Sequence, residues 1–371
     1  MKIISVVGAR PNFMKIAPFV RAIEKHNAGS GEQVEHVLVH TGQHYDHQMS
    51  QTFFDALNIP PADIHLGVGS GSHAEQVGNT MMAFEKVIME EKPDWVVVVG
   101  DVNATLACSV TAKKLHVKCC HIEAGLRSGD WAMPEEINRI VTDRLSDLLL
   151  TPDRLSIRNL KKEGVQDERI GFVGNTMIDT LEAQREKAAS LSIAHVLQEN
   201  LLLEESEIPI VEEGRYAVMT LHRPSNVDHK EIFKPLIDFL SGEVALDMPL
   251  LWPIHPRARK QLEIFGLWDQ VVATYNLILM RPIGYHELLR LNMSARLIIS
   301  DSGGIQGEST VLGVKCLILR NNTEWNVTLK EHGGTSVLVG NAVENIRKEY
   351  GLALEDDEVG KVPEFWDGKA A

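Results

Sequence analysis

Long apolar runs are missing from this chain of 371 residues, so we expect no segment that crosses a membrane. Cysteine is scarce: Cys108, Cys119, Cys120 and Cys316 are the only four, and their spacing fits neither a disulfide framework nor a zinc site. Basic residues are also fewer than acidic residues. The formal net charge of −14 argues against a nucleic-acid or anionic-membrane surface, although a local basic cleft for an anionic ligand remains compatible with it.

A signal-peptide pattern is also missing, because Met1-Lys2 leads directly into an apolar strand-like run. The adjacent Cys119 and Cys120 lie in another apolar run and are predicted to be reduced core residues. No fixed-period repeat or low-complexity tract interrupts the chain. We therefore expect a cytoplasmic globular protein.

Length and pattern predict two α/β domains. The chain exceeds the size at which one core stops growing, and 44% of its residues are hydrophobic. Short apolar runs alternate with helical periodicity, and Val96-Val-Val-Val99 is typical of a strand buried on both faces. We place an N-terminal domain at residues 1–174 and a C-terminal domain at 175–356. The tail at residues 357–371 is expected to return to the N-terminal domain.

The expected strands and helices follow from these runs. The strands are predicted at Ile3–Val7, His36–Thr41, Trp95–Gly100, Val117–Ile122, Arg215–Thr220, Pro249–Ile254, Leu277–Met280, Leu297–Ile299 and Lys315–Leu319. The helices of the first half are predicted at Phe13–Lys25, Ser50–Leu57, Ala74–Glu91, Ala104–Lys114 and Glu135–Ser146.

A phosphate-binding turn is predicted after the strand at Leu297–Ile299. Ser302, Gly303 and Gly304 start a helix, whose free N–H groups and positive dipole end suit an anion. Glu308 lies one helical turn further on the same face, where its carboxylate can accept hydrogen bonds from a ribose diol. The alternative is a glycine-rich turn that only caps a helix.

A second loop of this kind follows the first strand, in Gly8-Ala-Arg-Pro-Asn-Phe-Met-Lys15. Arg10 and Lys15 are placed to face a diphosphate, although a charged helix start without ligand is the alternative. Two such loops, one in each half, indicate two doubly wound domains that bind a ligand between them.

Carboxylates follow several strands of the first half. Asp101 comes directly after one strand, Glu123 after the next, and Glu135 and Glu136 begin a helix. Carboxylates held close raise the pKa of at least one of them, as general acid–base chemistry at neutral pH requires. The alternatives are a helix N-cap for Asp101 and dipole compensation for the two glutamates.

Histidines contribute less. His222 and Arg223 follow a strand and are suited to contact phosphate or a leaving group, although a structural role is the alternative for the histidine. His40, His44 and His47 cluster in sequence, but no acidic or cysteine partner has ligand spacing, so no metal is predicted.

These residues together resemble the non-hydrolysing UDP-N-acetylglucosamine 2-epimerases over almost the whole chain. The motifs that carry the resemblance are Gly8-Ala-Arg-Pro-Asn-Phe-Met-Lys15, His40-Thr-Gly-Gln-His-Tyr-Asp46, Gly100-Asp101, His121-Ile-Glu-Ala-Gly-Leu-Arg-Ser128, Met133-Pro-Glu-Glu-Ile-Asn-Arg139, Val173-Gly-Asn-Thr176, Thr220-Leu-His-Arg-Pro224 and Asp301-Ser-Gly-Gly-Ile-Gln306. The resemblance implies a GT-B fold of two facing Rossmann-like domains, with the active site in the cleft, in a homodimeric isomerase.

The family reaction inverts C2 of the sugar through a glycal, so the resemblance implies no cofactor and a UDP-sugar as the partner. It implies catalytic roles for Asp101, Glu123, Glu135, His222 and Lys15. The positions that it assigns to UDP-sugar binding are Arg10, Arg139, His222, Ser302, Gly303, Gly304 and Glu308. Gln43 and His44 match an allosteric site for a second UDP-sugar in some bacterial members.

Several positions depart from the family pattern. Gly307 precedes Glu308 where a second glutamate is usual, and Trp325 stands where many members carry an arginine. Residues 69–75 lack the arginine of the allosteric site. We therefore expect UDP-N-acetylglucosamine as substrate, with UDP-2,3-diacetamido-2,3-dideoxyglucuronate as the alternative.

Two alternatives come from other classes of protein. A GT-B glycosyltransferase would share the fold and the UDP site, but three strand-end carboxylates in one half argue against it. A non-catalytic UDP-sugar sensor would not need those carboxylates.

Overall fold

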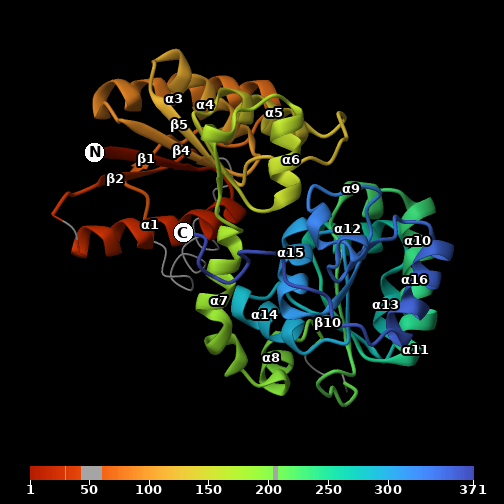
Figure 1. Ribbon diagram of the computed structural model, residues 1–371. Coiled ribbons are helices and arrows are strands. Elements are labelled where there is room, and N and C mark those ends of the chain that lie inside the picture. Colours follow the sequence, from red (N-terminus) through yellow and green to blue (C-terminus); the bar gives the residue numbers. More distant parts are fainter. Residues whose placement is uncertain (30, 43–60, 204–207) are drawn as a thin grey trace. The chain divides into compact units, whose positions relative to one another are not determined.

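The computed structural model describes residues 1–29, 31–42, 61–203 and 208–371 (Figure 1). It divides into two compact units: Met1–Ala183 with Glu364–Ala371, and Gln184–Pro363. Each unit is a parallel β-sheet covered by helices. None of the described helices combines the length and hydropathy needed to cross a bilayer.

The sheet of the first unit has seven strands, all parallel to their neighbours. Their order is β3-β2-β1-β4-β5-β6-β7. The strands are β1 Lys2–Val7, β2 Glu35–His40, β3 Ile64–His65, β4 Trp95–Val99, β5 Lys118–Ile122, β6 Leu148–Thr151 and β7 Ile170–Phe172. The chain order reverses between β1 and β4, so the ligand crevice of this sheet is expected at the carboxyl ends of these two strands.

Helices cover both faces of this sheet. The helical segments are α1 Arg10–Gly29, α3 His73–Glu91, α4 Asn103–Lys114, α5 Pro134–Leu145, α6 Arg154–Lys162, the 3-10 turn Asp167–Arg169 and α7 Thr176–Ala189. Figure 1 shows α3 and α4 on one face and α1 on the other. On the first face, Phe84 of α3 packs with Val96 and Val98 in one apolar cluster. Helix α3 starts at a capping box, in which Ser72 and Glu75 each accept the other's backbone N–H.

The sheet of the second unit has six parallel strands in the order β10-β9-β8-β11-β12-β13. The strands are β8 Ala217–Thr220, β9 Leu250–Pro253, β10 Leu277–Met280, β11 Leu297–Ser300, β12 Lys315–Ile318 and β13 Ser336–Leu338. The reversal here lies between β8 and β11. The carboxyl ends of these two strands therefore correspond to those of β1 and β4 in the first unit.

Both faces of the second sheet are apolar, because alternate residues of each strand enter opposite clusters. Met219 of β8 packs with helices α10, α12, α13 and α16, whereas Val218 packs with α8, α14 and α15. The helical segments of this unit are α8 Ile193–Asn200, α9 Pro224–Val227, α10 Lys230–Phe239, the π-helix Leu240–Val244, α11 Ala245–Asp247, α12 Pro256–Phe265, α13 Trp268–Ala273, α14 Tyr285–Met293, α15 Gly303–Leu312, the 3-10 turns Asn326–Thr328 and Lys330–His332, and α16 Val343–Glu355.

The nine predicted strands are all present within one or two residues of their predicted bounds. Three short strands were not predicted: β3, β6 and β13. Strand β7 overlaps the strand-like run at residues 171–173 that precedes the expected domain boundary. The predicted helix at Ser50–Leu57 lies outside the described residues. The four cysteines are buried free thiols, as expected of core residues.

The division between the units falls after Ala183, inside α7, whereas the sequence placed it after Gly174. The reason is packing: Ile178 and Leu181 of α7 are fully buried, and the Thr180 hydroxyl donates a 2.6 Å hydrogen bond to the Met14 carbonyl of α1. The first half of α7 thus belongs to the first unit.

The last residues of the chain return to the first unit and are fixed there by side-chain contacts. Trp366 is 1% exposed, and its Nε1 donates a 2.8 Å hydrogen bond to the Pro152 carbonyl. Phe365 packs on the Phe172 ring, with 4.7 Å between centroids. A Cβ atom at Gly174 would lie 2.0 Å from the Phe365 carbonyl oxygen, so only glycine fits there.

We predict that Trp366→Ala lowers the melting temperature by on the order of 10 °C, because truncating a buried tryptophan costs about 3–5 kcal/mol. Differential scanning calorimetry would measure the shift. Trp131→Ala is the matched control, since Trp131 is 68% exposed and its truncation should change little. Equal shifts in the two variants would show that the tail does not stabilise the first unit.

Candidate active site

At the switch point of the first sheet, Lys15 and Glu123 form a buried ion pair. Lys15 Nζ lies 2.6 Å from Glu123 Oε1, and the two residues are 8% and 7% exposed. Glu123 has a left-handed backbone with φ of 74°, unusual for a residue with a side chain. Among the residues that the structure describes, no group hydrogen-bonds to its buried Oε2. One carboxylate oxygen is therefore fixed by the lysine and the other is left for a ligand.

Burial sets the protonation of Glu123. Desolvation raises the pKa of its carboxyl, the Asp101 charge raises it further, and Lys15 and Arg139 offset only part of the increase. A carboxyl with a raised pKa exchanges protons closer to neutral pH, as a general acid or base must.

Asp101 follows β4 and is held by helix α5. Arg139 Nη2 lies 2.5 Å from Asp101 Oδ2, and Arg139 Nη1 lies 2.7 Å from Glu136 Oε2. Arg139 is 2% exposed, so this guanidinium is a buried link between the two carboxylates. The N-cap of α4 is Val102, which excludes the alternative that Asp101 serves as that cap.

The two glutamates that begin α5 behave differently. Glu136 is 2% exposed and accepts hydrogen bonds from the Ser128 and Gly129 backbone N–H groups at 3.0 and 2.9 Å. Glu135 is half-buried and has no hydrogen bond or ion pair among the residues that the structure describes. Dipole compensation is the alternative role predicted for both glutamates. Glu136 instead fixes the loop at Ser128 and Gly129, which precedes α5.

Asn12 was not singled out from the sequence, yet it joins the two loops of the switch point. Its Oδ1 accepts the Gly8 and Ala9 backbone N–H groups at 3.2 and 2.9 Å, and its Nδ2 donates to the Val99 carbonyl at 3.0 Å. The loop after β1 is thereby fixed to the end of β4. Arg10 is the first residue of α1, and only its backbone is described. Gln43 and His44 lie outside the described residues.

At the switch point of the second sheet, Asp301 joins the ends of β8 and β11. Its carboxylate lies 2.8 Å from His222 Nδ1 and accepts the Arg223 backbone N–H at 2.8 Å and the Asn226 amide at 3.1 Å. Burial raises the pKa of Asp301, but the His222 hydrogen bond and charge outweigh it and hold that pKa below its usual value. His222 itself is oriented with 40% of its side chain exposed.

The N-terminus of α15 carries the predicted phosphate cradle. Ser302 is its N-cap but makes no side-chain capping hydrogen bond, so the first N–H groups, including those of Gly303 and Gly304, are left for an anion. Glu308 is 5% exposed, and its Oε1 accepts a 3.0 Å hydrogen bond from the Tyr285 hydroxyl. Burial raises the pKa of Glu308 to about 7.

A buried ion pair beside this cradle was not predicted. Arg320 Nη2 lies 2.8 Å from Glu324 Oε2, and Arg320 is 7% exposed. A Cβ atom at Gly303 would lie 2.9 Å from the Glu324 carboxylate, so a side chain there would displace that end of the pair. No local motif marks this pair, because its effect depends on the approach of β12 to α15.

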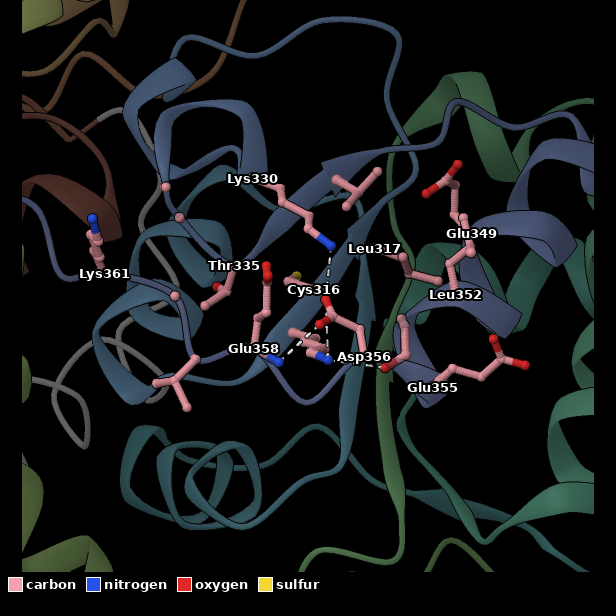
Figure 2. A pocket seen from close by; sticks show the side chains of 17 residues that line it. Cys316, Leu317, Lys330, Thr335, Glu349, Leu352, Glu355, Asp356, Glu358 and Lys361 are labelled. Atoms are coloured by element: carbon pink, nitrogen blue, oxygen red, sulfur yellow. Dashed lines mark hydrogen bonds and ion pairs between the residues drawn. The ribbon is translucent and has the colours of Figure 1, made fainter.

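A cavity of about 690 Å³ in the second unit lies away from these residues (Figure 2). It opens at the amino ends of β12 and β13, and its ion pairs join Asp356 to Lys330 and Lys315 at 2.8 and 3.3 Å. Parallel sheets bind ligands at their carboxyl ends. No predicted site residue lines this cavity, so it is not the candidate active site.

The predicted site residues thus form two groups, one in each unit. Lys15, Asp101, Glu123 and Arg139 come together in the first, and Ser302 to Gly304 with His222 follow the switch-point strands of the second. Among the described residues, no three histidine, cysteine or acidic side chains gather as metal ligands would. The two groups offer a proton-transfer site and an anion site.

Comparison with known proteins agrees with this chemistry. A family model described as UDP-N-acetylglucosamine 2-epimerase matches residues 26–371. The UDP-N-acetylglucosamine 2-epimerase of Methanocaldococcus jannaschii is 38% identical over 371 residues, covering 100% of this chain and 96% of its own. A UDP-2,3-diacetamido-2,3-dideoxy-D-glucuronate 2-epimerase of Pseudomonas aeruginosa is 37% identical, covering 96% and 94%.

Among solved structures, the Methanocaldococcus jannaschii UDP-GlcNAc 2-epimerase in complex with UDP-GlcNAc and UDP is similar, with a TM-score of 0.86 at 37% identity. The match covers 100% of this chain and 97% of that one. The predicted fold class, a GT-B type built from two doubly wound α/β units, is confirmed. This chain therefore belongs to the UDP-N-acetylglucosamine 2-epimerase family of isomerases.

Proposed function

We propose that this protein inverts C2 of a UDP-2-acetamido sugar and converts UDP-N-acetylglucosamine to UDP-N-acetylmannosamine. The observation that carries the proposal is Glu123, a buried carboxyl of raised pKa. Lys15 fixes one of its oxygens, and the other has no hydrogen-bond partner in the described part of the chain. Family membership supplies the substrate class, since relatives of this chain are UDP-N-acetylglucosamine 2-epimerases.

The reaction proceeds by elimination and re-addition. A carboxylate removes the C2 proton, the C1–O bond breaks with its electron pair leaving on the UDP β-phosphate, and a C1=C2 double bond forms. UDP oxygen then attacks C1 again while a proton is delivered to the other face of C2. Hydrogen leaves and returns as a proton, so the reaction is redox-neutral and needs no nicotinamide.

Within this reaction, Asp101, Glu123 and Glu135 are the proposed proton-transfer groups, with Lys15 as the positive partner of Glu123. Ser302, Gly303 and Gly304 bind the diphosphate at the N-terminus of α15, and Arg10 adds positive charge. His222, oriented by Asp301, contacts the diphosphate of the leaving UDP. Arg139 acts through Asp101, because it is buried between two carboxylates rather than free for the substrate.

Glu308 is proposed to bind the ribose diol, with Tyr285 holding its carboxyl in place. Gln43 and His44 are proposed to contact a second UDP-sugar. We also propose that the protein is a cytoplasmic homodimer. The family resemblance supports the dimer, and the buried free thiols are typical of a reducing compartment.

A second substrate is favoured by one position. Trp325 replaces the arginine that many family members carry, and a relative 37% identical acts on UDP-2,3-diacetamido-2,3-dideoxy-D-glucuronate. Parallel assays with both UDP-sugars would decide between them. The glycosyltransferase and sensor alternatives have no support among the relatives, which are named as epimerases.

We predict that incubation with UDP-N-acetylglucosamine in D2O places deuterium at C2, without added NAD or metal. Proton NMR of the sugar would detect the exchange together with the manno epimer. UDP-glucose is the matched control substrate, since it lacks the 2-acetamido group. If neither candidate UDP-sugar takes up deuterium at C2, the proposed function is refuted.

Asp101→Asn, Glu123→Gln and Glu135→Gln should each lower kcat by roughly 10²-fold or more, the scale of a lost general acid or base. The dissociation constant of UDP should change little, because these groups serve the sugar. Glu90→Gln is the control, an exposed glutamate on α3 of the same unit. Steady-state kinetics and calorimetric titration would measure both quantities, and near-normal kcat in all three variants would remove them from the mechanism.

The affinity for UDP-N-acetylglucosamine should rise several-fold from pH 6 to pH 8. Burial raises the pKa of Glu308 to about 7, so the carboxylate that accepts the ribose hydrogen bonds forms only as the pH passes that value. The sugar diphosphate itself does not titrate in this range. Isothermal titration calorimetry would give the profile, and Glu308→Gln should flatten it; a flat wild-type profile would contradict this assignment.

A further inference from the structure

A buried pair behind the carboxylates, His121 and Asp143, has no role in the reaction described above. His121 is 0% and Asp143 is 1% exposed, and His121 Nδ1 lies 2.6 Å from Asp143 Oδ1. His121 Nε2 lies 2.8 Å from the Gly100 carbonyl oxygen. Both ring nitrogens face acceptors, so both hydrogen bonds form only when the ring carries two protons.

The partners of Asp143 stabilise its ionised carboxylate. Burial raises its pKa, but His121 and Arg127 outweigh the burial and leave the pKa below its usual value. Arg127 Nη1 lies 2.7 Å from Asp143 Oδ2, and the same oxygen accepts the Gly125 backbone N–H at 3.0 Å. The pair is thus closed on every side by charged or backbone partners.

His121 contacts the backbone immediately before Asp101. Gly100 has φ of +68°, and a Cβ atom there would lie 3.3 Å from Lys15 Nζ. The Gly100 carbonyl belongs to the peptide bond that leads into Asp101. A hydrogen bond from His121 to this carbonyl fixes the plane of that peptide and with it the direction in which Asp101 leaves the strand.

Asp143 contacts the loop that carries Glu123. Residues Glu123 and Gly125 both have positive φ, 74° and 84°, and a Cβ atom at Gly125 would lie 2.6 Å from the Ser156 carbonyl oxygen. A non-glycine residue in the left-handed region is disfavoured and needs surrounding contacts to hold it. Asp143 supplies such a contact through the Gly125 N–H.

We propose that His121 and Asp143 are positioning residues for the epimerase reaction, which fix Asp101 and Glu123 relative to each other without contacting the sugar. The inference rests on the proposed function. Geometry carries it: one buried pair hydrogen-bonds to the Gly100–Asp101 peptide and to the Gly125 N–H, two residues beyond Glu123 in the same loop. A purely structural ion pair would lower stability when broken and leave the folded enzyme active.

Two variants of His121 separate the contacts. His121→Gln keeps an amide donor near the position of Nε2 and so keeps a donor for Gly100; His121→Asn keeps one near Nδ1 and loses Gly100. We expect His121→Asn to lower kcat by roughly 10–10²-fold with KM changed less than about threefold, because positioning acts on the chemical step. His121→Gln should recover much of that loss. Asp143→Asn should resemble His121→Asn.

Asp153→Asn is the matched control. Asp153 is a buried aspartate of the same unit, 3% exposed, whose Oδ1 caps α6 at Ser156 N, 2.7 Å away. The Asp153→Asn variant should have a lower melting temperature but an unchanged kcat. Turnover is measured at a temperature at which circular dichroism shows that every variant is folded. Equal kcat in the His121→Asn and Asp153→Asn variants would overturn the proposal.

A second readout does not need turnover. The carboxyl ¹³C resonance of Glu123, assigned by its loss in Glu123→Gln, is titrated in each variant. The midpoint should move in His121→Asn and Asp143→Asn and stay in Asp153→Asn. An unchanged midpoint with kcat within twofold of wild type refutes the positioning role. If the midpoint moves in these two variants while the wild-type protein epimerises neither UDP-sugar, the proposed function is refuted and the positioning role stands.

Discussion

The ion pair between Lys15 and Glu123 is the constraint on which the first unit's site depends. It joins helix α1 to the loop after β5, within 2.6 Å and almost without exposure. Breaking a buried pair by removing one partner costs about 3–5 kcal/mol, because the remaining charge is left uncompensated. The geometry therefore holds only while β1, which leads into α1, and β5 keep their places in the sheet. The same burial that makes the pair costly raises the pKa of Glu123 and so suits it to proton transfer.

In the second unit, the residue that organises the site is Asp301. Asp301 holds the ends of β8 and β11 together and orients His222, while α15 leaves its first N–H groups without a side-chain cap. In both units, a buried carboxylate at the reversal of strand order organises the loops. Each sheet thus combines rigid strands with one polar contact that positions the residues next to the ligand.

Much of this arrangement is readable from the sequence, because strand-end carboxylates and the Ser302–Gly304 turn follow continuous apolar runs. The contacts that hold them are not, since Asn12 and Asp143 act through partners distant in sequence. Short strands such as β13 escape prediction because three residues carry too little pattern. The place of Trp366 and the division inside α7 likewise depend on tertiary packing.

The central claim is that C2 inverts through cleavage of the C1–O bond. The most direct measurement is positional isotope exchange with UDP-N-acetylglucosamine carrying ¹⁸O between C1 and the β-phosphorus. If UDP leaves and returns, ³¹P NMR should show the label moving into the non-bridging β-phosphate positions as the manno epimer accumulates. Formation of the epimer with all ¹⁸O still in the bridging position would contradict the account.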